Sequence, residues 1–177
     1  PAPVPMEPDH IENMRRLAAA GASLWCGYNL TAPKANGKRG KVPISRCGSR
    51  KIGTNNPNEF YPLDDALRLV DAGSADGVGM LTSGAPGIVG IDLDKCIGPD
   101  GELAGWAVAI VERFATYTEV SVSGTGLHLF MLATKPPEYT KEKYSDSTGV
   151  ELEVYGDGCK RFLTVSGKLW RDGLGQI

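Results

Sequence analysis

The sequence predicts an α+β fold, in which helices pack on an antiparallel or mixed β-sheet. Apolar residues recur at helical spacing over 101–115, and a capping residue and a glycine bound another predicted helix at 10–20. Short runs bounded by glycine-rich turns and typical of strands dominate the stretch from 77 to 170. With 177 residues and 41% apolar content, the chain is long and apolar enough to form one globular domain without cross-links.

The ordered part is predicted to begin after a proline-rich segment. Residues 1–8 read Pro-Ala-Pro-Val-Pro-Met-Glu-Pro, which has too many prolines for regular structure, so we expect a flexible lead-in. Asp9 can cap a helix over 10–20, and a short strand is expected at 23–28. No internal repeat or linker follows, so residues 9–177 are predicted to form a single domain.

The segment from 31 to 58 is expected to be a loop, because it is rich in Gly, Asn, Pro and Ser. It contains no acid, although the whole chain has a formal net charge of −2. Such a local positive field is typical either of a solvated loop or of a contact with phosphates, in a nucleic-acid backbone or a triphosphate. Its seven cations are Lys34, Lys38, Arg39, Lys41, Arg46, Arg50 and Lys51.

The remaining elements are predicted from apolar periodicity and from the glycines and prolines that bound each run. In chain order they are a helix at 62–72, strands at 77–82 and 88–94, a helix at 101–115, strands at 116–123 and 127–133, a loop at 135–149, and a hairpin of strands at 150–155 and 161–170.

Two aspartates lie at the end of the strand Ile-Val-Gly-Ile-Asp-Leu-Asp. Since side chains alternate along a strand, Asp92 and Asp94 face the same side, and Ile91 and Leu93 face the other. The two carboxylates are then about 6–7 Å apart along the strand. That spacing suits a pair of divalent cations about 3.5–4 Å apart, although an isolated Asp-x-Asp also fits a solvated strand end.

A glycine-rich turn and a histidine follow in the sequence Ser-Gly-Thr-Gly-Leu-His. Gly124 and Gly126 allow a tight turn whose N–H groups can bind a phosphate, and Ser123 and Thr125 add hydroxyl donors. His128 begins the return strand and can donate to a triphosphate oxygen. Taken alone, the segment also fits an ordinary hairpin turn followed by a strand histidine.

A third acidic position occurs in the strand Val-Glu-Leu-Glu-Val-Tyr. Glu151 and Glu153 share one face of this strand, opposite its three apolar residues. Either could complete a metal-ligand set with the two aspartates, because divalent cations bound in such sites take several oxygen ligands. The same pattern also fits an amphipathic strand with one solvated face.

The order of these motifs, ending in Arg-Phe-Leu-Thr-Val-Ser-Gly at 161–167, resembles the archaeo-eukaryotic primase superfamily in its primase–polymerase branch of phage and plasmid replication proteins. The resemblance covers roughly residues 41 to 168. It implies an RRM-like sheet with flanking helices, joined to a smaller N-terminal α/β unit. A larger replication protein, of which this chain is a fragment, is also implied.

The resemblance also implies roles for individual residues. Asp92 and Asp94 match the catalytic metal ligands, and Glu153 matches the third acid better than Glu151 does because it lies two residues before a tyrosine. His128 matches the histidine that, with the serine of its motif, holds the phosphates of the incoming nucleotide. Arg161 matches an arginine that either contacts a phosphate or orders the acids.

The function implied is templated nucleotidyl transfer with two Mg²⁺ or Mn²⁺ ions, in primer synthesis or DNA polymerisation. The expected partners are a single-stranded DNA template, a primer and nucleoside triphosphates, with a helicase domain in the larger protein. Two other functions fit the same residues: a metal-dependent nuclease or phosphodiesterase, and a catalytically idle module that binds single strands or an origin.

The cysteines and the hydropathy pattern set the expected location. Cys26, Cys47, Cys96 and Cys159 are scattered with no Cys-x-x-Cys pair, which argues against a zinc finger or a disulfide framework and for a reducing compartment. No apolar run approaches the roughly 20 residues that a membrane-spanning helix needs. We therefore expect a cytoplasmic protein that does not contact membranes, within a bacterial host if it is encoded by a phage or plasmid.

Overall fold

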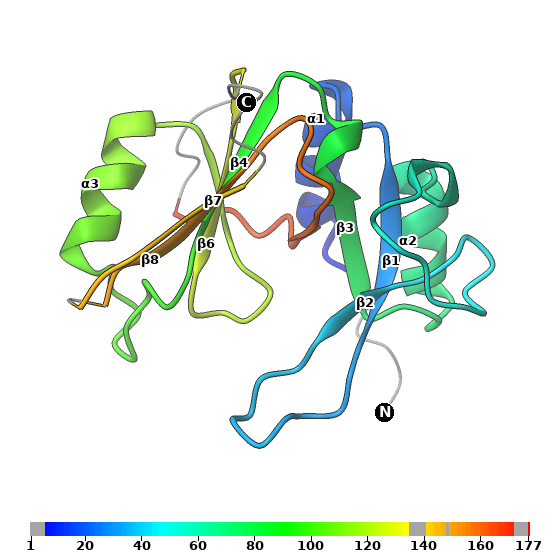
Figure 1. The fold of residues 1–177 in the computed structure, drawn as a ribbon, viewed down its shortest axis with the longest axis horizontal. Coiled ribbons are helices and arrows are strands. Elements are labelled where there is room, and N and C mark those ends of the chain that lie inside the picture. Colours follow the sequence, from blue (N-terminus) through cyan, green and yellow to red (C-terminus); the bar gives the residue numbers. More distant parts are fainter. Residues whose placement is uncertain (1–5, 135–140, 148, 172–176) are drawn as a thin grey trace.

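The computed structural model describes residues 6–134, 141–147, 149–171 and 177, and they form two antiparallel sheets and three α-helices (Figure 1). The α+β class is therefore confirmed. The elements are α1 (Pro8–Ala19), β1 (Trp25–Leu30), β2 (Lys41–Pro43), α2 (Leu63–Asp71), β3 (Gly77–Leu81), β4 (Ile88–Leu93), α3 (Gly105–Phe114), β5 (Tyr117–Val120), β6 (Leu127–Leu132), β7 (Lys141–Ser145), β8 (Glu151–Tyr155) and β9 (Phe162–Val165), with short 3-10 turns at Pro57–Glu59 and Thr82–Gly84.

The first sheet has the strand order β2-β1-β3-β9. Helix α2 packs against β1 and β3 because its buried residues recur at helical spacing, at Leu63, Ala66, Leu67 and Val70. Helix α1 begins at Pro8, where a proline costs no hydrogen bond, so regular structure starts earlier than predicted. In Figure 1, α2 and α3 lie at opposite ends of the molecule with the two sheets between them.

The second sheet has the order β5-β6-β4-β8-β7, so β4 lies at its centre between β6 and β8. One face carries a buried apolar cluster with α3, in which Ile91 and Leu93 of β4 pack with Ala107 and Val111 of the helix. A separate core cluster fills the space between the two sheets. The face of β4 that carries Asp92 is therefore opposite the face that α3 covers.

The predicted hairpin of 150–155 and 161–170 is wrong. Strand β8 pairs with β4 and β7 in the second sheet, whereas β9 pairs with β3 in the first. The physical reason is burial: Leu163 and Val165 of β9 belong to the core between the sheets, which a hairpin with β8 would not reach. The predicted loop at 135–149 instead contains β7 over the part that the structure describes.

Gly90 lets the two sheets approach each other at β4. A Cβ at this position would lie 2.9 Å from the Leu163 side chain and 3.5 Å from the Phe130 ring. The bare backbone of Gly90 therefore gives Leu163 the space to pack directly on β4. None of the described helices is long and apolar enough to span a bilayer.

Candidate functional site

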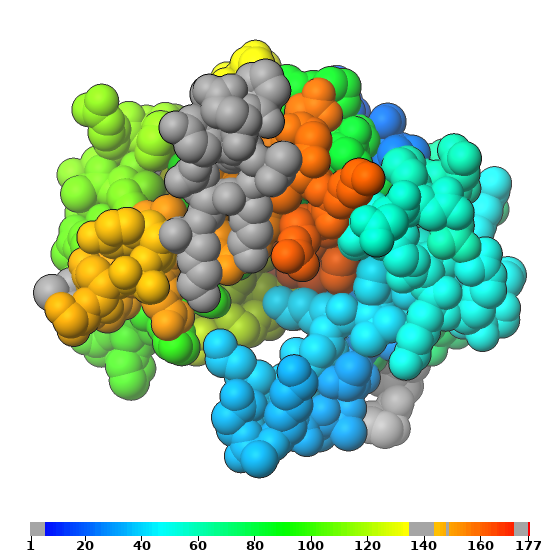
Figure 2. Space-filling view, in the orientation of Figure 1, coloured from blue at the N-terminus to red at the C-terminus, as the bar shows by residue number. Residues whose placement is uncertain are grey.

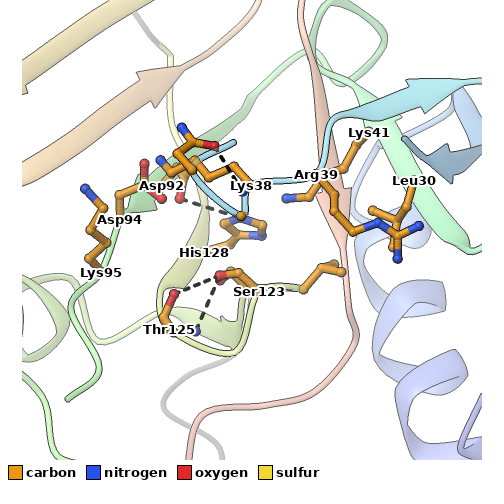
Figure 3. A pocket seen from close by; sticks show the side chains of 14 residues that line it. Leu30, Lys38, Arg39, Lys41, Asp92, Asp94, Lys95, Ser123, Thr125 and His128 are labelled. Atoms are coloured by element: carbon orange, nitrogen blue, oxygen red, sulfur yellow. Dashed lines mark hydrogen bonds and ion pairs between the residues drawn. The ribbon is translucent and has the colours of Figure 1, made fainter. Parts of the chain in front are cut away.

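A pocket of about 600 Å³ lies where the second sheet meets the β1–β2 connection (Figure 3). In Figure 2 the segment around residues 31–41, coloured blue, projects from the molecule with a hollow between it and the second sheet. The polar lining comes from the end of β4, from the β5–β6 turn with the start of β6, and from the β1–β2 connection with the start of β2. The polar residues that line it are Asn36, Lys38, Arg39, Lys41, Asp92, Asp94, Lys95, Ser121, Ser123, Thr125 and His128.

Asp92 occupies the centre of this arrangement because β4 is the central strand. The strand register sets it opposite His128 on β6 and opposite Glu153 on β8. Its Oδ1 lies 3.6 Å from His128 Nε2. Burial raises the pKa of Asp92 above its ordinary value; the charge of His128 opposes this shift, and the nearby Asp94 adds to it.

Asp94 lines the same pocket immediately beyond the end of β4. Its backbone N–H donates to the carbonyl of Glu151 at 2.9 Å, so the β4–β8 pairing extends as far as this residue. The structure thus brings the two aspartates to one pocket. The repulsion between two neighbouring carboxylates is relieved when a cation binds between them.

The two candidate third acids have different surroundings. Glu151 forms an ion pair with Lys95, whose Nζ lies 3.1 Å from Glu151 Oε2. Glu153 lies directly opposite Asp92 in the register, and its carboxylate accepts a hydrogen bond from the Tyr155 hydroxyl. Neither glutamate lines the pocket. The sequence pattern alone did not separate the two glutamates. The strand register does, because it places Glu153 directly opposite Asp92.

The acidic residues fit a divalent cation in chemistry and register. Carboxylate oxygens are the ligands that Mg²⁺ and Mn²⁺ prefer, and directly opposed residues on paired strands have Cβ atoms about 4.5–5.5 Å apart. Within the described part of the chain, however, no three His, Cys, Asp or Glu side chains converge closely enough to hold an ion as they stand.

The β5–β6 turn is held by its own hydroxyl groups. Ser123 Oγ lies 2.9 Å from Ser121 Oγ and 3.1 Å from Thr125 Oγ1. The Gly124 N–H donates to the Ser121 carbonyl, so this group is not free to bind a phosphate as the sequence predicted. Ser123 and Thr125 line the pocket, whereas Gly124 and Gly126 shape the turn from outside its lining.

Gly124 and Gly126 are favoured in the turn for different structural reasons. Gly124 has φ of +77°, in the left-handed region that favours glycine. A Cβ on Gly126 would lie 2.5 Å from the backbone oxygen of Leu93, at the end of β4. The turn that carries the hydroxyls is therefore in direct backbone contact with the strand that carries the acids.

His128 lines the pocket next to Asp92, is buried, and is paired on both sides. Its Nδ1 lies 3.2 Å from Oε1 of Glu119, a fully buried residue of β5 that the sequence reasoning missed. The signal was available in the hairpin register: Ser121 pairs with Gly126, so counting outward places Glu119 opposite His128.

The seven cations of 31–58 do not act as one group. Lys38, Arg39 and Lys41 line the pocket beside the aspartates. Arg46 instead pairs with the buried Asp65 at 2.6 Å, and the guanidinium of Arg50 pairs with Glu59. The prediction that no counter-charge serves these residues is therefore wrong for two of them, because acids beyond residue 58 fold back onto the loop.

The other predicted contact residues lie outside the pocket that contains Asp92. Arg50 and Lys51 line a separate hollow of about 410 Å³ on the first sheet. Lys34 lines neither cavity. The Arg161 side chain is exposed and does not line the pocket that contains Asp92. The Arg161 backbone carbonyl accepts a hydrogen bond from the Thr82 N–H.

The chain is similar in sequence to a known phage protein. Over 138 residues the chain is 30% identical to the DNA primase-polymerase of Nitratiruptor phage NrS-1. The match covers 77% of this chain but only 19% of the phage protein, so the chain spans about a fifth of the relative's length. No protein-family profile matches the chain.

Proposed function

This chain is a homologue of a phage primase–polymerase, and from that premise we propose that it catalyses DNA-templated nucleotidyl transfer, in primer synthesis or extension. One observation supports this most strongly: Asp92 lines a pocket together with hydroxyls and cations, and the strand register places it between His128 and Glu153. Acids and cations that line the same pocket match a nucleoside triphosphate that binds with its divalent ions.

Asp92, Asp94 and Glu153 are proposed to hold two Mg²⁺ or Mn²⁺ ions. When bound, these ions supply activation of an attacking 3′-hydroxyl and neutralisation of the charge on the leaving pyrophosphate. Glu153 is preferred to Glu151 because Glu153 opposes Asp92 directly, whereas Glu151 is engaged by Lys95. Backbone pairing with β8 holds Asp92 within β4 and Asp94 just beyond its end.

The phosphate-binding roles fall to the groups that surround these acids. Ser123 and Thr125 present hydroxyls that can donate to the triphosphate, and His128 presents its Nε2 side. The cations of the β1–β2 connection neutralise phosphate charge in the triphosphate or the template. Since no Phe, Tyr or Trp of the described residues lines the pocket, we propose backbone contacts to the template rather than base-specific ones.

The wider context is part of the same proposal. A single-stranded DNA template, a primer and nucleoside triphosphates are the proposed ligands, and a helicase domain in a longer protein is a proposed neighbour. The second sheet with α3 is proposed to be the RRM-like part of a primase fold, and the first sheet its smaller unit.

The test is primer synthesis and extension on single-stranded DNA, with Asp92→Asn, Asp94→Asn and Glu153→Gln assayed separately in Mg²⁺ and Mn²⁺. Loss of a metal ligand should lower activity by more than about 100-fold. Glu151→Gln is the matched control: it removes the same charge two residues away on the same strand face and should keep activity within about twofold.

Three outcomes would contradict the proposal. Full activity in both aspartate variants would remove the metal assignment. Shortened rather than lengthened DNA strands would indicate a nuclease. Calorimetry that finds DNA binding without metal-dependent triphosphate binding would indicate an idle binding module.

A further inference from the structure

Glu119 has a position that core packing does not explain. Its side chain is 0% exposed, although a glutamate is among the residues least often buried completely. It lies on β5 directly opposite His128 of β6 and does not line the pocket. The carboxylate is therefore behind the histidine ring, on the side away from the proposed substrate.

Four hydrogen-bond donors converge on this one carboxylate. Oε1 lies 3.2 Å from His128 Nδ1 and accepts from the Ser166 N–H at 2.9 Å. Oε2 accepts from the Gly167 N–H at 3.0 Å and from the Tyr117 hydroxyl at 3.0 Å. Only a carboxylate, with acceptors on both oxygens, satisfies this set, because an amide would direct its own donor at another donor.

This contact fixes which nitrogen of His128 faces the pocket. Because an ionised carboxylate can only accept, the contact with Glu119 Oε1 is a hydrogen bond when Nδ1 carries a hydrogen. Nε2 then faces Asp92, at 3.6 Å from its Oδ1. The ring also packs edge-on against Phe130, with centroids 6.3 Å apart and planes at 76°, so rotation about the side chain is restricted.

We infer that Glu119 is a positioning residue, which orients His128 so that its Nε2 side is presented to the nucleotide; this inference rests on the proposed function. A buried charge is weak support for stability, because well-packed apolar residues often stabilise a core as much. A carboxylate that is hydrogen-bonded to an imidazole can hold the ring in one orientation, and an apolar residue cannot.

The first measurement uses the unmodified 177-residue chain and does not depend on activity. The chain contains two histidines, so ¹⁵N-histidine labelling gives two rings, and His10→Gln identifies which signals belong to His128. A long-range ¹H–¹⁵N correlation spectrum should place a hydrogen on His128 Nδ1. A bare Nδ1 would overturn the inference, whatever the enzyme does.

The second measurement is a double-mutant cycle in primer extension. Glu119→Gln should lower kcat/KM for the nucleotide by about 10–100-fold, as loss of a supporting partner does at comparable sites. In a His128→Asn background the same substitution should change kcat/KM by less than about twofold, because the ring it orients is gone. Equal losses in both backgrounds would indicate a purely structural role and overturn the inference.

Tyr117→Phe is the matched control. It removes a donor from the same carboxylate, but at Oε2 rather than at the oxygen that contacts His128. It should keep kcat/KM within about twofold of the unmodified chain even if its melting temperature falls. A loss as large as that of Glu119→Gln would count against the inference.

The two proposals fail in different ways. If Asp92→Asn is inactive but Glu119→Gln has full activity, the positioning role is wrong and the proposed function stands. If Asp92→Asn keeps full activity, the proposed function is wrong, while the Nδ1 measurement still reports on the Glu119 contact.

Discussion

The Asp92 side chain is mostly buried, and burial makes its negative charge unfavourable in the folded protein. Only 22% of its side chain is exposed, with Asp94 and Glu153 nearby, and burial is the largest cause of its raised pKa. A carboxyl with a raised pKa in the folded state binds its proton more tightly there than in the unfolded chain. At neutral pH, ionised Asp92 therefore lowers the stability of the metal-free protein.

Asp92→Asn should accordingly raise the melting temperature of the metal-free protein at pH 7 while abolishing metal-dependent activity. The gain should shrink as the pH falls through the raised pKa and disappear below the usual value of 3.8, where both states are protonated. Thermal melts from pH 7 to pH 3.5 measure this. A lower melting temperature for the variant at pH 7 would show that the Asp92 charge is net stabilising.

Sequence reasoning at the residue scale succeeded where a local period decided the geometry. Alternation along a strand was enough to place Asp92 and Asp94 in one pocket and Ile91 in the core. It could not separate Glu151 from Glu153, because the same alternation puts both on one face. The partners that distinguish them, Lys95 and the register with β4, are set by tertiary structure.

Among the elements, the cationic segment 31–58, which contains β2, is the one whose charges the fold redistributes. Its cations were expected to share one role, but only Lys38, Arg39 and Lys41 line the pocket. Arg46 extends to Asp65 on α2, a buried acid that also pairs with Arg68. Ion pairs with acids distant in sequence cannot be read from a local charge count.

A paired substitution, Lys38→Ala with Arg39→Ala, should weaken binding to single-stranded DNA and flatten its salt dependence. For every phosphate that the protein no longer neutralises, the slope of log K against log salt should become shallower by about 0.7. Fluorescence anisotropy of a labelled oligonucleotide over a range of salt concentrations measures both quantities.

Arg46→Ala is the control from the same cationic segment, 31–58, but from beyond β2. Its loss removes one positive charge but leaves the pocket cations in place, and Asp65 keeps Arg68 as a partner. Affinity should stay within about twofold of the unmodified chain. Equal weakening by the control and the pocket variant would mean that overall charge, rather than the pocket, governs binding.

Across the whole molecule, the family and the class of fold were predictable, and the separate pairing of β8 and β9 was not. The resemblance to primase–polymerases is confirmed by the phage homologue, and the α+β class by the structure. The hairpin of 150–155 with 161–170 was wrong because neighbouring strands in sequence pair by default. In the structure β9 pairs with β3, and this pairing buries Leu163 and Val165 of β9 in the core between the sheets.

Buried tyrosines set the alkaline limit of this fold. Tyr28, Tyr61, Tyr117 and Tyr155 are all buried, and burial raises the pKa of Tyr28 and Tyr61 to about 12 and those of the other two further. The unfolded chain would ionise near the usual pKa of 10.0. Stability from the neutral phenols is therefore fully present below pH 10 and is lost as the pH rises toward 12.

We expect the free energy of unfolding, from urea titrations, to fall by about 1.4 kcal/mol per pH unit for each such tyrosine above pH 10. Phenolate absorbance should rise together with unfolding rather than before it. Tyr28→Phe should make the fall less steep. An unchanged slope in that variant would show that Tyr28 ionises without penalty in the folded protein.

The pairing of β9 with β3 also has a consequence for synthesis on the ribosome. Strand β3 ends at Leu81, and its partner Phe162 is made roughly 80 residues later. At about 5–20 residues per second, one edge of β3 stays unpaired in the nascent chain for roughly 4–16 s. During that interval it is open to wrong partners. Correct folding during synthesis thus depends on β9 emerging before the unpaired edge of β3 pairs with another chain.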